Sequence, residues 1–203
     1  MESLVQAVIA VLAIANPIGA VPIFLSLTEE LDAGARNRAA ARVAVAVLVI
    51  LTASALFGRV ILNTFSITDA AFRAAGGLVI VLMGLEMLRG TPTRVQHDPK
   101  PPAEEDDAIL VPLAMPLIAG PGAITTVISL VAQRPGPDGI MRALIAVAIT
   151  TVVLFVTLRW AGVLARVLSA RGQRIFLRFM GLILLSIGAQ LLLSGTRTFF
   201  TTG

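Results

Sequence analysis

The sequence contains no cysteine, a single histidine and a single lysine among its 203 residues. Without cysteine, a disulfide, a thiolate nucleophile and a Cys-ligated metal site are all excluded. His97 and Lys100 both lie in a polar, proline-rich stretch, and no pair of carboxylates lies inside an apolar segment. Neither a histidine base nor a serine–lysine dyad is therefore available within the apolar segments. We predict that the chain is not an enzyme.

Charged residues are also scarce. They make up 14% of the chain, against about 25% in soluble domains, while 57% of the residues are hydrophobic and the mean hydropathy is +0.91. A soluble fold of this size would have too little polar surface to cover its apolar surface. The chain is therefore expected to be an integral membrane protein. We assign its net charge of +4 to basic loops at the membrane and not to nucleic-acid binding.

Long segments with few or no charges alternate with short polar ones. About 20 apolar residues cross a bilayer as a helix, so the pattern predicts an all-α membrane fold with six transmembrane helices. The corresponding segments are 3–28, 43–57, 70–88, 108–133, 143–158 and 179–196. Prolines and acidic residues fill 91–107, which we interpret as a flexible linker between residues 1–90 and residues 108–203.

Basic residues are distributed unevenly between the expected loops. Loops after the first, third and fifth spans share one face, which carries eleven of the 16 lysine and arginine residues, and the other face carries five. Basic loops are retained in the cytoplasm. We therefore predict that both termini lie outside the cytoplasm and that the linker lies inside.

The two halves of the chain resemble each other. The first span of each half carries a similar segment: Ile14-Ala15-Asn16-Pro17 aligns with Ile118-Ala119-Gly120-Pro121. The third spans share glycines and a polar position, in the pairs Gly77/Gly181, Gly84/Gly188 and Glu86/Gln190. Because each half has an odd number of spans, the halves would enter the membrane from opposite sides. Inverted repeats of this kind are typical of secondary transporters, although an old duplication without transport would leave the same pattern.

Helix-breaking residues interrupt the first and fourth spans at equivalent places. Asn16-Pro17-Ile18-Gly19 interrupts the first span, and Gly120-Pro121-Gly122 interrupts the fourth, where Pro112 and Pro116 precede it. Backbone groups freed by such breaks cannot face lipid. We predict that the two breaks face each other near the bilayer midplane and bind a substrate. The candidate residues are Asn16, Pro17, Gly19, Ser26, Gly120, Pro121, Gly122, Thr125, Thr126 and Ser129.

Glu86 is the one carboxylate well inside an apolar segment. An ionisable residue within the membrane suggests ion coupling, but Arg89 follows one helical turn later, and an interfacial ion pair explains Glu86 equally well. The glycines of the third and sixth spans are expected to allow close helix packing. We interpret Val47, in the second span, as facing lipid.

With these residues identified, the sequence resembles the MarC family of multipass membrane proteins, also described as small neutral amino acid transporters. The resemblance is carried by segments 15–24, 72–77, 112–124 and 178–181, and it extends over essentially the whole chain. It implies a multi-pass protein of the bacterial or archaeal inner membrane that transports small neutral amino acids such as glycine or alanine. The family's breaks correspond to Asn16, Pro17 and Gly19, and to Gly120, Pro121 and Gly122.

The leading hypothesis is a secondary transporter that works by alternating access around the two breaks. A Gly-rich phosphate loop is absent from the sequence, which argues against direct ATP coupling. We expect no cofactor, and a proton or sodium ion as the coupling ion. The expected partners are a small-molecule substrate and the lipid bilayer but not nucleic acid, and the sequence is compatible with a homo-oligomer. Two alternatives stay open: a non-transporting membrane partner or scaffold, and a transporter or exporter of another small polar solute.

Overall fold

The computed structural model describes residues 4–89, 118–167 and 170–202. Within these ranges every regular element is a helix. The helices are α1 (Leu4–Ala15), α2 (Pro17–Leu27), α3 (Ala33–Thr64), α4 (Asp69–Arg89), α6 (Pro121–Gln133), α7 (Pro137–Arg159), α8 (Ala161–Val167) and α9 (Ala170–Thr202). The predicted linker 91–107 lies outside the described residues, as do Pro112 and Pro116.

Five of the expected spans appear as helical segments long and apolar enough to cross a membrane. They are α1 with α2, α3, α4, α7, and residues Arg174–Thr201 of α9. For the other expected span, 108–133, the structure describes residues from 118 onward, and there α6 is a shorter apolar helix of 13 residues. The all-helical fold predicted from composition is therefore confirmed.

Several helices extend well past the apolar segments that predict them. α3 has 32 residues and begins with Ala33, where the Asp32 side chain caps it by accepting the Ala35 N–H at 2.6 Å. Its first turns carry arginines, yet Ala39 and Ala40 are buried there. Arg38 and Arg42 are exposed, whereas Arg36 is partly buried and donates to the Thr28 carbonyl at 2.9 Å. A charge count alone misses such helical ends. The short helix α8 was not expected at all.

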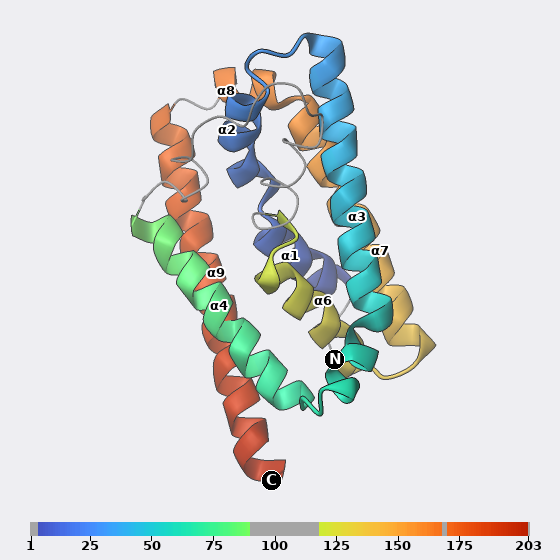
Figure 1. Ribbon diagram of the computed structural model, residues 1–203. Helices are drawn as coiled ribbons and strands as arrows, with labels where there is room; N and C mark the ends of the chain where they lie inside the picture. The colour runs from blue at the N-terminus through green and yellow to red at the C-terminus, as the bar shows by residue number, and fades with distance from the viewer. Residues whose placement is uncertain (1–3, 90–117, 168–169, 203) are drawn as a thin grey trace.

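The helices form two outer pairs around a central group. Figure 1 shows α1, α2 and α6 in the middle, with α4 and α9 packed together on one side and α3 and α7 packed together on the other. α6 contacts α4, α3 and α7, and α1 contacts α6, α7 and α9. The α2–α3 and α7–α8 connections lie at one end of the bundle, whereas the α3–α4 and α6–α7 turns lie at the other.

The core is built where α3, α7 and the central helices meet. A stripe of α3 at helical spacing is buried there, and it includes Val43, Val47 and Leu51. The interpretation of Val47 as a lipid-facing residue is therefore wrong: its exposed fraction is 0%, whereas that of Val49 is 60%. Because α3 is apolar on all sides in this region, its sequence carries no polar face that would mark which side is buried.

Glycines bring α4 and α9 into close contact, as the sequence predicts. A Cβ atom added at Gly77 would lie 2.7 Å from the Gly188 carbonyl oxygen, and one at Gly84 would lie 2.8 Å from that of Gly181. The order of these partners shows that the two helices run antiparallel. The obstructing atoms are largely backbone, so the absence of side chains is what lets the helices approach so closely.

Candidate binding site at the α1–α2 junction and the start of α6

A single residue, Asn16, separates α1 from α2. Its backbone has φ 42° and ψ 62°, in the left-handed region that asparagine tolerates better than most residues. Pro17 follows at the first position of α2, where its missing N–H is not needed. The Asn16 side chain accepts the Gly19 N–H at 3.2 Å, so the first turn of α2 is capped by the junction residue itself.

The junction also leaves a carbonyl group of α1 without its usual partner. In a continuous helix the Ala13 carbonyl would accept from residue 17, but Pro17 has no N–H to donate. Ala13 is buried, and so are Ile14 and Ala15. The end of α1 therefore presents a buried carbonyl with negative partial charge inside the bundle.

Among the described residues, the start of α6 has no side-chain cap. Its N-cap residue is Gly120, which is extended with φ −70° and ψ 179° and offers no side-chain acceptor. Pro121 occupies the first helical position, and the following residues, Gly122 and Ala123, are buried. Their N–H groups belong to the first turn, which has no intrahelical acceptors. Unlike α2, α6 thus offers donors and a positive helix end to a group outside the chain.

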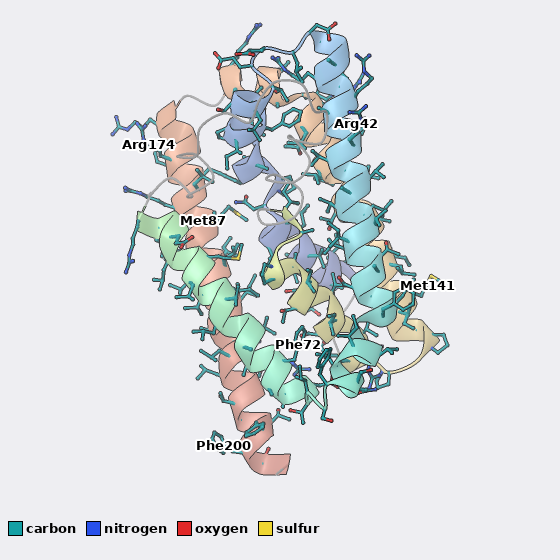
Figure 2. The ribbon with its side chains drawn as sticks, in the orientation of Figure 1. Arg42, Phe72, Met87, Met141, Arg174 and Phe200 are labelled. Carbon is teal, nitrogen blue, oxygen red and sulfur yellow. The ribbon has the colours of Figure 1, made fainter. Side chains whose placement is uncertain are left out.

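The two segments meet inside the bundle, and α4 lines the place where they meet. A Cβ atom at Gly122 would lie 3.4 Å from Cγ2 of Ile14, which is two residues before the junction. The same position lies 3.0 Å from Cγ1 of Ile80 and 3.4 Å from Sδ of Met83, both on α4. At the junction itself, Nδ2 of Asn16 lies 3.9 Å from Sδ of Met87, which also belongs to α4. Figure 2 shows Met87 near the end of α4, beside the central helices.

The hydroxyl residues named from the sequence divide into two groups. Thr125, Thr126 and Ser129 are buried on α6. Thr126 donates to the Gly122 carbonyl at 2.9 Å, and the Thr125 side chain fills the space above Gly76 of α4. Ser26, by contrast, is exposed near the end of α2, so the structure does not bring it to the junction.

The remaining sequence-predicted residues lie as follows. Pro17 is buried and Gly19 is half-buried against the Asn16 side chain, while Gly120 is buried and Pro121 is exposed. Glu86 is exposed in the last turn of α4, whereas Met83 and Met87 of that helix are half-buried against the core. Its role in ion coupling stays a prediction. Among the described residues no group of acidic, histidine or cysteine side chains could hold a metal ion.

Sequence reasoning missed the contribution of α4. Ile80 and Met83 lie beside Gly122, and Met87 lies beside Asn16, but three apolar residues in an apolar helix give no chemical signal. It also missed Thr150 on α7, which is fully buried and whose hydroxyl has no hydrogen-bond partner among the described residues. The pair Thr150-Thr151 inside an otherwise apolar segment was the available signal.

Comparison with known proteins then identifies the family. Residues 1–200 match the model of the MarC family integral membrane proteins. The chain belongs to the MarC family. MarC-family relatives include UPF0056 membrane proteins of Pyrococcus abyssi, 37% identical over 95% of this chain and 93% of the relative, and of Methanocaldococcus jannaschii, 35% identical over 97% of each. A UPF0056 membrane protein of Escherichia coli is 31% identical over 95% of this chain and 91% of its own length.

Membership in the MarC family makes this chain an integral membrane protein, with relatives in both bacteria and archaea. The relatives' names describe them as membrane proteins and give no substrate. No solved structure matches the chain. What the protein does must therefore be argued from the helix junctions.

Proposed function

We propose that this protein is a secondary transporter of small neutral amino acids, which binds its substrate between the Asn16 junction and the first turn of α6. One observation carries the proposal: the interrupted helix and the uncapped helix start pack together inside the bundle, where a carbon added at Gly122 would lie 3.4 Å from Ile14. Interrupted helices buried at such a contact are the usual location of substrate sites in secondary transporters.

The chemistry of the two segments is complementary to a zwitterion. The uncapped N–H groups at Gly122 and Ala123 suit a carboxylate, since they combine hydrogen-bond donors with the positive end of the helix dipole. The Ala13 carbonyl, deprived of its helical donor by Pro17, suits an ammonium group. Because Asn16 caps α2 with its own side chain, the two helix starts are not equivalent. We therefore assign the carboxylate to α6.

The space at this contact favours a small substrate. Gly122 is buried, and even one added carbon there would contact Ile80, Ile14 and Met83 at 3.0–3.4 Å. The side chains that surround it are aliphatic or thioether groups, without charge. A substrate side chain of the size found in glycine or alanine matches such surroundings better than a large or charged one.

Alternating access is supported by the way in which equivalent helices pair. The second helices of the two halves, α3 and α7, pack together, and so do the third helices, α4 and α9. The alignment of the two halves pairs Gly77 with Gly181 and Gly84 with Gly188. It therefore converts the Gly77–Gly188 contact into the Gly181–Gly84 contact, and the structure contains both. Reciprocal contacts of this kind are expected for two inverted repeats around a pseudo-two-fold axis.

Uptake into proteoliposomes tests the proposal. We expect labelled glycine and alanine to enter faster than into protein-free vesicles, and faster still under an imposed proton or sodium gradient. Uptake of a different small polar solute, without uptake of glycine or alanine, would indicate a transporter with another substrate. Folded protein that moves none of a panel of amino acids and polar solutes, under either gradient, would refute transport and favour a scaffold role.

A further inference from the structure

A line of polar side chains runs along α9 on the side away from α4. Gly181, Gly188 and Gly195 mark the face that packs on α4. The residues Ser186, Gln190, Ser194, Arg197 and Thr201 follow one another at helical spacing on a different face, and with Ala189, Leu193 and Thr198 they line an open groove of about 720 Å³. We call these eight residues the α9 polar face. Each of them belongs to α9, so the groove opens outward from the bundle.

Most hydroxyl groups of the α9 polar face are already satisfied by their own helix. Ser186 donates to the Leu182 carbonyl at 2.9 Å, and Ser194 donates to the Leu191 carbonyl at 3.1 Å. Thr201 likewise donates to the Arg197 carbonyl at 2.9 Å. Hydroxyl groups that bond back to the preceding turn can face lipid at low cost. They therefore do not by themselves require a partner.

Gln190 differs from these hydroxyl residues. Its side chain is exposed, and it has no hydrogen bond within the residues that the structure describes. It lies within the apolar span Arg174–Thr201, seven residues before Arg197, which is about 10 Å along the helix axis. At that depth an amide has two donors and an acceptor that hydrocarbon cannot satisfy. A polar partner on another molecule would relieve this unfavourable exposure.

We propose that the α9 polar face is the contact between two copies of this chain. Copies inserted in the same direction are related by a two-fold axis along the membrane normal, which places Gln190 of one beside Gln190 of the other. A primary amide carries both donor and acceptor, so two glutamines satisfy each other, whereas lipid satisfies neither. Ser186 and Ser194, one turn to either side, are small enough to let the helices approach. Leu193, which is 68% exposed, would pack beside them.

The absence of cysteine makes the contact directly testable by cross-linking. In native membranes, Ser186→Cys should form a disulfide-linked dimer on mild oxidation, because each thiol would face its copy. Val152→Cys, on α7 and 62% exposed, is the matched control and should stay monomeric. Dimers through Val152→Cys with none through Ser186→Cys would place the contact elsewhere and overturn the proposal.

A second measurement tests the amide itself. Gln190→Leu should raise the dimer dissociation constant about tenfold, the size expected for losing hydrogen bonds between membrane helices, while Gln190→Asn should retain more of the dimer. Both variants should keep the helical content and thermal stability of the parent protein, since the side chain is exposed. A monomeric parent protein in membranes, or an unchanged dimer in Gln190→Leu, would refute the proposal. Neither measurement depends on transport.

Discussion

Adding one methyl group at Gly77 perturbs the α4–α9 contact in a way that can be worked out from the structure. The new Cβ atom would overlap the Leu192 backbone nitrogen and would lie 2.7 Å from the Gly188 carbonyl oxygen and 2.9 Å from the Leu192 Cα. Ordinary contacts are about 3.5–4.0 Å. The obstacles are backbone atoms, which no rotamer change can move. The helices would therefore have to separate locally by about 1 Å.

The energetic consequence follows from two opposing terms. Overpacking of a close contact costs about 1–3 kcal/mol, and the better helix propensity of alanine offsets up to about 1 kcal/mol. With backbone as the obstacle we expect the cost to lie at its upper end, so Gly77→Ala should lose about 1–2 kcal/mol. For a chain of this length that corresponds to a fall of about 5 °C in apparent Tm.

Thermal unfolding in detergent, followed by circular dichroism, measures this shift. Gly162→Ala on α8 is the control, because a Cβ atom there would meet nothing within 4 Å, and its Tm should stay level or rise slightly. The double variant Gly77→Ala/Gly188→Ala should cost less than the sum of its parts, since both methyl groups separate the same helices. A Gly77→Ala protein as stable as the parent would refute the assigned close contact.

Further substitutions test the proposed site and the orientation of the chain. Gly122→Val should block uptake, because its Cβ atom alone would lie 3.0–3.4 Å from Ile80, Ile14 and Met83 and its methyl groups would press on them, while Val49→Leu, on the exposed side of α3, should transport normally. Asn16→Ala should destabilise the protein by about 1 kcal/mol more than Asn16→Gly does, since both lose the cap and alanine alone strains the left-handed backbone. If Glu86 couples an ion, Glu86→Gln should abolish gradient-driven uptake but leave passive exchange. Reporter fusions should place the C-terminus outside the cytoplasm and the 91–107 linker inside.

Each of these predictions has an outcome that would count against it. Normal uptake by Gly122→Val would remove the site from the start of α6. Equal stability of Asn16→Ala and Asn16→Gly would show that the junction is not strained. Unchanged coupling in Glu86→Gln would reduce Glu86 to an interfacial residue, and a cytoplasmic C-terminus would reverse the topology.

The sequence by itself determined the features that depend on residue chemistry. Scarce charge and long apolar segments required a membrane and helices, because only internal hydrogen bonding satisfies a backbone in lipid. Glycines at matching positions of the third and sixth spans predicted the close contact between α4 and α9, since that packing depends on the absence of side chains. The Asn16-Pro17 pair marked where α1 gives way to α2, because proline cannot donate to the helix.

Only the tertiary structure decided which sides of these helices face one another. Val47 and Val49 are identical in chemistry, but the first is buried and the second exposed, and a segment that is apolar all round does not encode that difference. The same holds for Ile80 and Met83 beside Gly122 and for Met87 beside Asn16, which look like any apolar residues in sequence. Ser26 shows the reverse, since this hydroxyl residue is exposed near the end of α2, away from the junction. Hydropathy indicates whether a residue tolerates an apolar environment. Because lipid and the protein interior are similarly apolar, packing decides which of the two a residue faces.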